Sequence, residues 1–150
     1  MMQLKSAHGN FTIISGFPGI GKTYFCNLHP QVTDSDSHAF KEYSPEVYAE
    51  HIRTLYLLHQ PVLVSTHESV RERLKASDVP FLLVYPAKEL KQDYIQRYML
   101  RSGFNGGNDF AHRIKMNWDT WIDDLRSMCG VPKIELQEGQ FLSDVIEVLP

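Results

Sequence analysis

Apolar residues follow two alternating patterns along the chain. The first is a short, nearly continuous run of apolar and β-branched residues, which is typical of a strand buried on both faces. Residues 11–15, 61–65 and 81–85 have this pattern, and residues 133–136 predict a further strand. Val32 leads into another strand, whose end is expected at the polar cluster of residues 34–37. Five strands are therefore predicted.

In the second pattern, apolar residues recur at helical spacing. Residues 21–28 predict a short helix that stops before Pro30, because proline cannot continue a helix. Ser44 is a predicted N-cap with proline at the first helical position, and the stripe that follows predicts a helix to about Gln60. Residues 65–68 have the spacing of a capping box, which predicts a third helix through residue 76.

The last third of the chain predicts two further helices separated by a loop. Apolar positions between residues 90 and 98 predict a helix that ends around residue 101. Residues 102–108 contain three glycines and two asparagines, which predicts a mobile loop. Asp109 is expected to cap a long amphipathic helix that ends at Gly130, and residues 143–149 are expected to form a closing helix.

This alternation of strands and helices predicts the fold class. A repeated β–α order specifies a mostly parallel sheet covered by helices on both faces, that is, a three-layer αβα fold. The chain has 150 residues and contains no internal repeat or low-complexity linker, so we expect residues 1–150 to form a single domain.

Composition and charge exclude several classes of protein. The net charge of −3 does not favour tight binding to duplex nucleic acid. The longest apolar stretches are far shorter than a bilayer span, and the N-terminus does not resemble a secretory signal. Cys26 and Cys129 lack the spacing of a disulfide framework or a zinc site. We therefore expect a cytoplasmic protein with no membrane association.

The segment between the first strand and the first helix carries a chemical motif. Residues 16–23 read Gly-Phe-Pro-Gly-Ile-Gly-Lys-Thr, a complete phosphate-binding G-x4-G-K-T loop in the strand–loop–helix context that supports it. Glycines let backbone N–H groups surround an anion. Lys22 is expected to contact the β- and γ-phosphates of ATP, and the Thr23 hydroxyl to bind Mg²⁺. The expected nucleotide-binding residues are Gly16, Pro18, Gly19, Ile20, Gly21, Lys22, Thr23 and Tyr24.

Through this motif the chain resembles the P-loop NTPase superfamily. Its size and order of elements are most similar to the nucleoside monophosphate kinase branch, including small adenylate-kinase-like proteins. The resemblance implies a five-stranded sheet in the order 2-3-1-4-5, ATP at the carboxyl ends of the strands, and a neighbouring pocket for a small-molecule phosphoryl acceptor. It also implies a short lid around residues 97–115.

The resemblance places acidic and basic residues around the expected phosphates. Asp34 and Asp36 lie where related kinases have acids that hold Mg²⁺ or engage the acceptor, and Asp36 is the preferred catalytic acid. Side chains two apart in an extended segment point the same way, although the same residues are also good turn formers. The family's acid at the end of the third strand has no counterpart in residues 62–67. Asp34 and Asp36 therefore supply the missing charge, or Mg²⁺ is held by Thr23 and the phosphates alone.

Several basic side chains are candidates for contact with phosphate. Arg97 and Arg101 are four residues apart on one helix and are expected to be catalytic lid arginines, since a guanidinium binds phosphate oxygens in pairs. Arg113 and Lys115 are weaker candidates, as are Arg53, His67 and Glu68 for the acceptor. Each has an alternative as ordinary surface charge or, for Glu68, helix capping. The tyrosines and tryptophans at helical spacing, Tyr94, Tyr98, Trp118 and Trp121, are interpreted as core.

Three functions fit these observations. The first is an ATP-dependent kinase acting on a nucleotide or another small molecule. The second is an ATPase or GTPase that acts through a partner protein, although the chain has no N/T-K-x-D guanine signature and no apolar run closing with Asp-Glu. The third is a module that binds ATP without turnover, which the missing strand-three acid allows.

Overall fold

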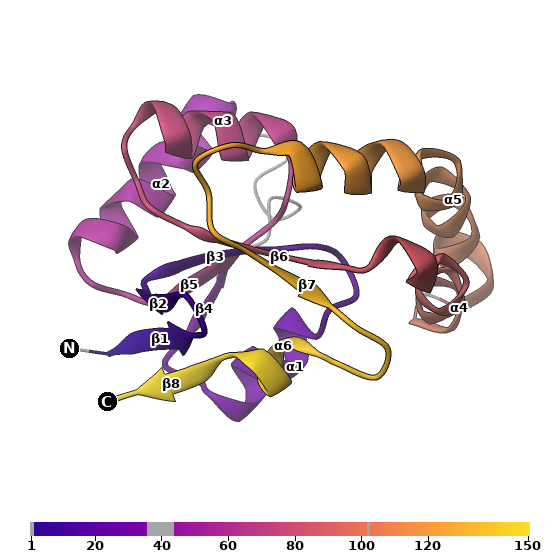
Figure 1. The fold of residues 1–150 in the computed structure, drawn as a ribbon, viewed down its shortest axis with the longest axis horizontal. Coiled ribbons are helices and arrows are strands. Elements are labelled where there is room, and N and C mark those ends of the chain that lie inside the picture. The colour runs from indigo at the N-terminus through magenta and orange to yellow at the C-terminus, as the bar shows by residue number, and fades with distance from the viewer. Residues whose placement is uncertain (1, 36–43, 102) are drawn as a thin grey trace.

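The computed structural model describes residues 2–35, 44–101 and 103–150, with the backbone alone for residues 45 and 103–108. The described residues form an α/β fold in which a five-stranded parallel sheet lies between two layers of helices (Figure 1). The strands of this sheet are β3 (Ile13–Gly16), β4 (Thr33–Ser35), β5 (Val62–Val64), β6 (Leu82–Pro86) and β7 (Lys133–Leu136). The predicted fold class is confirmed at this level.

The strand order confirms the expected 2-3-1-4-5 arrangement. The sheet runs β4-β5-β3-β6-β7, so β3 is the central strand and the loop that follows it emerges at the middle of the carboxyl edge. Each neighbouring pair is parallel, with Ile14 opposite Leu63 on one side and Leu82 on the other. The carboxyl edge of such a sheet is where ligands bind in open α/β folds.

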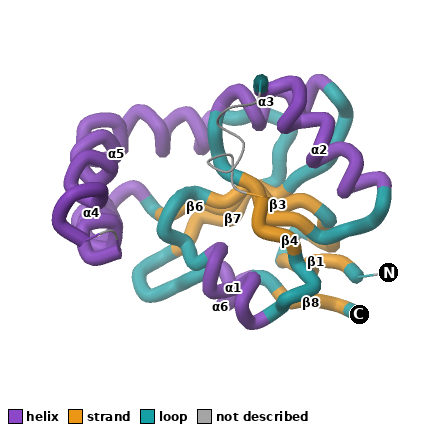
Figure 2. Tube along the Cα trace, turned by 180° about the vertical axis from the view of Figure 1, so that it is seen from behind, coloured by secondary structure: helices purple, strands orange, loops and turns teal. Residues whose placement is uncertain are grey.

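Helices cover both faces, which explains why the strands are apolar throughout. Figures 1 and 2 show α2 (Pro45–Leu57), α3 (Glu68–Ala76) and the C-terminal half of α5 (Gly103–Ser127) on one side of the sheet. On the other side lie α1 (Lys22–Leu28) and α6 (Leu142–Val145). Ile13 and Val62 pack in the cluster of α2 and α3, whereas Ile14 and Leu63 pack in the cluster of α1. Adjacent residues of one strand therefore enter opposite cores.

α5 begins two residues after the end of α4 (Lys91–Arg101), so the predicted mobile loop is wrong over residues 103–108, and residue 102 lies outside the described residues. α5 begins at Gly103, and Asp109 lies inside it instead of capping it. Glycine lowers helix stability by about 1 kcal/mol per residue relative to alanine. Packing between the two helices overrides this propensity: the rings of Tyr98 and Phe110 meet edge to face, with centroids 5.1 Å apart. α5 ends at Ser127, three residues before the predicted stop at Gly130, which has the expected left-handed conformation.

Two local predictions near the sheet also need correction. Asp34 lies within β4, not in a loop after it, because an edge strand tolerates an exposed polar side chain on its open side. The capping box predicted at residues 65–68 is absent, since α3 has His67 as its N-cap residue and no side-chain cap. The Ser65 hydroxyl instead accepts from the His67 amide at 3.4 Å. The Ser44 cap of α2 is confirmed, because its hydroxyl accepts from the Val47 amide.

The chain ends form a second sheet that the local pattern did not predict. β1 (Gln3–Ser6) pairs antiparallel with both β2 (Gly9–Phe11) and β8 (Glu147–Leu149). Phe11 therefore belongs to β2 instead of the central strand, and the predicted closing helix is helical only over α6. The β1–β8 pairing joins residues too far apart in sequence to leave a local signal, whereas β1 and β2 form a local hairpin that the analysis of the pattern missed. Within the described residues, no helix is both long and apolar enough to cross a bilayer.

Candidate functional site

Residues 16–23, here called the glycine loop, connect the central strand β3 to α1. Gly19 and Gly21 have φ angles of +89° and +98°, which side chains other than glycine rarely adopt. A Cβ atom on Gly16 would lie 2.7 Å from Ile20 Cδ1, so a side chain there would displace the Ile20 side chain. The local backbone conformation thus favours glycine at positions 19 and 21, and side-chain packing favours it at position 16.

Every carbonyl from Gly16 to Gly21 accepts a hydrogen bond. These carbonyls are held by side chains and backbone amides from the loop itself, from α1, from α4 and from the start of α6. In loop order, the donors are Lys22 Nζ, the Ile20 amide, the Tyr98 hydroxyl, Arg97 Nη1, the Leu142 amide and the Phe25 amide. The loop therefore has one fixed conformation, determined partly by elements far away in sequence.

Some backbone N–H groups of the loop have no such partner. Within the described residues, no hydrogen bond is formed by the N–H groups of Gly19, Gly21 and Thr23. Buried or half-buried N–H groups without acceptors are unusual in folded proteins. A loop with its carbonyls held and its amides available has the chemistry of an anion-binding nest.

Lys22 lies at the end of this loop with its side chain folded over it. The residue is only 8% exposed, and Nζ donates to the Gly16 carbonyl. A buried ammonium is stable only when polar groups compensate its lost hydration. The positive charge is therefore held at the mouth of the glycine loop.

The other predicted nucleotide-binding residues differ in accessibility. Thr23 and Tyr24 are exposed in the first turn of α1, and Tyr24 is 60% exposed. Ile20 is fully buried, so only its backbone can meet a ligand. The Pro18 carbonyl accepts the hydrogen bond from the Tyr98 hydroxyl.

Arg97 contacts the carbonyl side of the glycine loop. Its Nη1 donates to the Gly19 carbonyl at 3.0 Å, and its Nη2 lies 2.8 Å from Asp93 Oδ2. The guanidinium also stacks on the Tyr94 ring at 4.1 Å and on the Phe141 ring at 4.4 Å. These contacts fix the position of the Arg97 side chain, and its hydrogen bond to Gly19 supports the loop.

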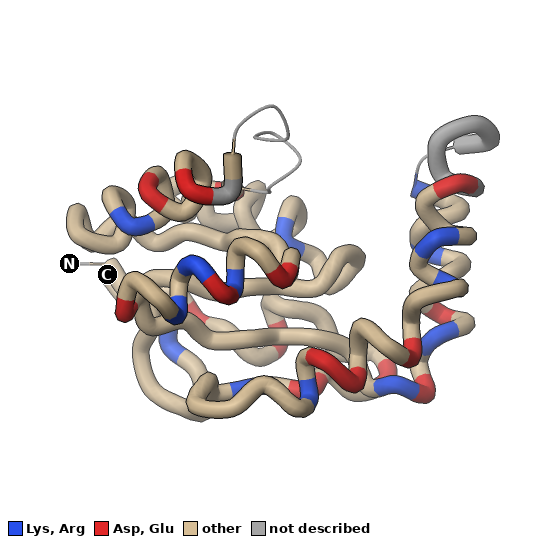
Figure 3. The backbone as a smooth tube through the Cα atoms, turned by 90° about the horizontal axis from the view of Figure 1, so that it is seen from above, with Lys and Arg blue, Asp and Glu red and all other residues tan. Residues whose placement is uncertain are grey.

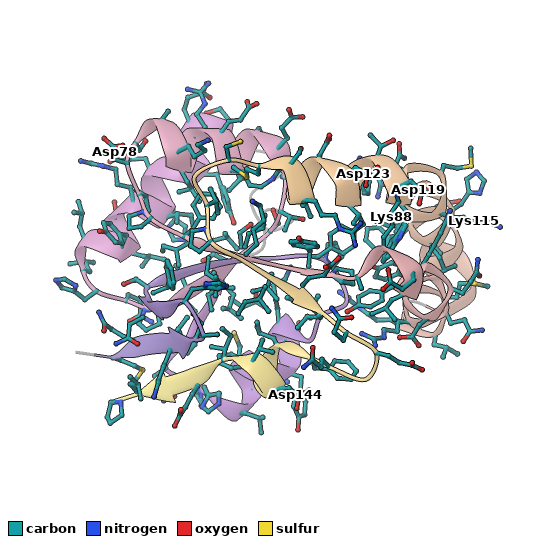
Figure 4. The ribbon with its side chains drawn as sticks, viewed as in Figure 1. Asp78, Lys88, Lys115, Asp119, Asp123 and Asp144 are labelled. Atoms are coloured by element: carbon teal, nitrogen blue, oxygen red, sulfur yellow. The ribbon has the colours of Figure 1, made fainter. Side chains whose placement is uncertain are left out.

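The remaining basic candidates are exposed side chains of α4 and α5. Arg101 is exposed at the end of α4, and Arg113 and Lys115 are exposed on α5. Figure 3 shows α4 and the N-terminal half of α5, here called the arm, projecting away from the sheet. In Figure 4, Lys115 lies at the outer side of the arm, while the Lys88–Asp123 ion pair of 3.0 Å joins the turn before α4 to the C-terminal half of α5.

The acidic candidates are only partly covered by the structure. Asp34 is exposed on the edge strand β4, opposite Leu63 and therefore on the face covered by α1. Burial raises the pKa of the neighbouring Cys26 thiol to about 11; the negative charge of Asp34 adds to this shift and the positive charge of Lys22 opposes it. The charges of Asp34 and Lys22 thus both act on the Cys26 thiol in α1. Asp36 lies outside the described residues.

The turn between β5 and α3 adjoins the glycine loop, because β5 neighbours β3. Ser15 Oγ donates to the Ser65 carbonyl at 2.8 Å, which ties the two strand ends together. His67 and Glu68 are exposed. Arg71 is 8% exposed and donates from Nε to the Thr66 carbonyl at 2.8 Å and from Nη1 to Met128 Sδ at 3.5 Å. Its burial lowers the pKa of the guanidinium.

Two sequence interpretations have different outcomes in the structure. Arg53, a candidate for the acceptor phosphate, is exposed and pairs with Glu50 at 3.6 Å on the surface of α2. Tyr94, Tyr98 and Trp118 are buried as expected, and Trp121 is partly buried. Sequence reasoning did not find that the Tyr98 hydroxyl holds the glycine loop. No local pattern distinguishes it from the other core aromatics.

The residues present fit a magnesium nucleotide only in part. Mg²⁺ in such sites takes one or two protein ligands and completes its shell with phosphate oxygens and water. The described residues offer the Thr23 hydroxyl and the Asp34 carboxylate on the α1 side of the sheet. Among the residues described, no group of three His, Cys, Asp or Glu side chains could hold a metal ion alone. Any bound cation would therefore depend on the nucleotide.

No protein-family model matches the chain, and a search of curated proteins also returned no match. The functional argument consequently rests on the geometry of the chain itself.

Proposed function

We propose that this protein binds ATP at the glycine loop and transfers the γ-phosphoryl group to a nucleotide or another small-molecule acceptor. The observation that carries the proposal is the G-x4-G-K-T sequence at the end of the central strand, with its carbonyls held outward and amides left for an anion. P-loop nucleotide binding is the established use of this strand–loop–helix motif.

The roles of the loop residues follow from their chemistry. The amides of Gly19, Gly21 and Thr23 donate to the phosphate oxygens, while the Lys22 ammonium neutralises the β- and γ-phosphates. Thr23 supplies its hydroxyl to Mg²⁺, and Asp34 supplies a carboxylate to the cation's water shell. Asp36 keeps its sequence-based role as the second acid. When bound, Mg²⁺ neutralises charge on the transferring phosphoryl group.

The two arginines of α4 are proposed to have different roles. Arg97 supports the loop through Gly19, whereas Arg101 is exposed on the arm and is the arginine proposed to meet the transferring phosphoryl group. Charge develops on those oxygens mainly in the transition state. Arg101→Ala should therefore lower the turnover rate by about 10³-fold with little change in ATP affinity, as for arginines in other phosphoryl-transfer enzymes.

A second candidate function is an ATP-binding module without turnover. It is favoured by the end of β5, where Val64 is followed by Ser65 and not by a carboxylate. The two free thiols, Cys26 and Cys129, fit the cytoplasmic setting proposed for either function.

A screen of acceptors tests the proposal. Nucleoside monophosphates, nucleosides and small hydroxylated metabolites would each be mixed with ATP and Mg²⁺, and ADP release would be measured with a no-acceptor control. Acceptor-dependent ADP that disappears in Lys22→Ala supports the kinase. Tight ATP binding with no ADP release for any acceptor supports the passive module, and absence of ATP binding refutes both.

A further inference from the structure

Two tyrosines one turn apart on α4 meet the glycine loop in different ways. Tyr94 is fully buried and Tyr98 is 1% exposed. A Cβ atom built on Gly19 would lie 2.9 Å from Tyr98 Cε1 and 3.3 Å from Tyr94 Cδ2, so both rings lie against the same glycine. The two residues are thus matched in position and burial.

Only one of their hydroxyls contacts the loop. The Tyr98 hydroxyl donates to the Pro18 carbonyl at 2.5 Å. The Tyr94 hydroxyl is buried and has no hydrogen-bond partner within the described part of the chain, and Arg97 stacks on its ring. Burial raises the pKa of both phenols, so both stay protonated. Tyr98 is therefore a permanent donor to the loop.

The contact with Pro18 has a consequence for the amide of the next residue. The peptide plane that carries the Pro18 carbonyl also carries the Gly19 N–H, and in a trans peptide these two groups point in opposite directions. No described peptide bond is cis. Holding the Pro18 carbonyl on the α4 side therefore directs the Gly19 N–H to the opposite side of the loop, away from α4.

A backbone contact fixes the second glycine in the same way. The Leu142 amide donates to the Ile20 carbonyl at 2.9 Å, and the peptide plane of Ile20 carries the Gly21 N–H. The amides of Gly19 and Gly21 are two of those without an acceptor among the described residues. Glycine at positive φ has a soft backbone, so without these contacts the planes could rotate.

We infer that Tyr98 is a positioning residue of the phosphate site: its hydroxyl holds the Pro18–Gly19 peptide plane in the orientation that aims the Gly19 N–H at an anion. This inference rests on the proposed function for the identity of the anion, a nucleotide phosphate. The orientation of the Pro18–Gly19 peptide plane follows from the hydrogen bond itself and does not depend on the proposed function. Because Tyr98 belongs to the arm, the arm also determines the shape of the loop.

The test compares Tyr98→Phe with its matched control, Tyr94→Phe. Both variants keep the ring and lose one hydroxyl. ATP affinity would be measured with Mg²⁺ by calorimetry, and motion of the Gly19 amide by ¹⁵N relaxation dispersion without nucleotide. Tyr98→Phe should weaken ATP binding about tenfold, since one hydrogen bond is lost, and should produce microsecond-to-millisecond exchange at Gly19. Tyr94→Phe should leave both measurements at the parent values.

Thermal stability is measured for the same variants, because a less stable protein also binds less ATP. Removing the unpartnered Tyr94 hydroxyl should leave thermal stability unchanged or raise it. Where Tyr94→Phe raises stability, the double variant Tyr94→Phe, Tyr98→Phe recovers part of any loss caused by Tyr98→Phe and is used for the same affinity and relaxation measurements.

Two results would overturn the inference: a rigid Gly19 amide in Tyr98→Phe, or equal changes in both single variants. If the parent itself does not bind ATP, the proposed function fails, and the relaxation measurement alone still decides whether Tyr98 orients the Pro18–Gly19 plane.

Discussion

Two strand-to-helix turns lie side by side at the carboxyl edge of the sheet, and they are built differently. The turn from β3 to α1 is the glycine loop, with three glycines of the motif and a lysine. The turn from β5 to α3 contains Ser65, Thr66 and His67 and is tied down by the buried side chain of Arg71. Both turns leave backbone N–H groups without an acceptor among the described residues, since α3 also has no side-chain cap. They differ in the glycines at positive φ and the buried lysine of the first turn.

The two turns also differ in which elements hold their polar groups. In the β3–α1 turn, elements distant in sequence hold the Pro18, Gly19 and Ile20 carbonyls, and the amides of Gly19, Gly21 and Thr23 have no acceptor among the described residues. In the β5–α3 turn, the Ser65 carbonyl and hydroxyl and the Thr66 carbonyl all take part in internal contacts. The glycines and the lysine, more than the position at the sheet edge, therefore distinguish the β3–α1 turn.

The largest expected effect is on the β3–α1 turn. Lys22→Ala should reduce ATP affinity roughly 10- to 150-fold, because it removes charge-assisted hydrogen bonds worth about 1.5–3 kcal/mol. The fold should persist. Calorimetric titration with ATP and Mg²⁺ checks the prediction, with Lys5→Ala on the exposed side of β1 as the control. Parent affinity in Lys22→Ala would contradict the assignment of the loop.

Gly19→Ala tests the backbone of the same turn. Alanine at a φ of +89° is strained by about 1–3 kcal/mol, and its Cβ would also meet the Tyr98 ring. Gly130→Ala is the matched control, since Gly130 has a φ of +74° but open space around its Cβ position. Both variants should lose thermal stability, and only Gly19→Ala should lose ATP binding. Equal binding by the two variants would show that the shape of the glycine loop is unimportant.

Arg71→Met tests whether the β5–α3 turn is structural. The variant keeps an apolar stem but loses the hydrogen bond to Thr66, which should reduce the free energy of unfolding by about 1–3 kcal/mol. ATP affinity should stay within about twofold of the parent, since neither hydrogen bond of the Arg71 side chain reaches the glycine loop. Urea denaturation and ATP titration measure the two quantities. A large loss of affinity at unchanged stability would place the β5–α3 turn in the nucleotide site.

The smallest expected effect concerns the charges around Cys26. With a thiol pKa near 11, Cys26 should react with iodoacetamide at pH 8 far more slowly than the exposed Cys129. Asp34→Asn lowers the thiol pKa and should raise the rate, whereas Lys22→Ala raises the pKa and should lower the rate. Peptide mass spectrometry follows each cysteine separately. Changes of the same sign in the two variants would show that Lys22 and Asp34 do not act on Cys26 as described.

The local sequence predicted much of the parallel sheet and the position of the glycine loop. Continuous apolar runs report burial on both faces, and the glycine spacing reports a backbone conformation, so both signals are local. The same reasoning correctly interpreted Tyr94, Tyr98 and Trp118 as core. It failed at β8 and at residues 103–108, where β1 and the packing of α4 on α5 supply the stabilisation.

The residue types, the motif and the alternation of elements were determined by the sequence alone, because each depends on neighbours within a few positions. Tertiary structure decided which side chains support the glycine loop. Tyr98 and Arg97 are about 80 residues from Pro18 and Gly19 in sequence, and Leu142 is still farther from Ile20. These contacts exist only after β6 and β3 pair and bring α4 beside the loop. A hydrogen bond depends on ångström-scale distance and direction, which no local pattern of residues encodes.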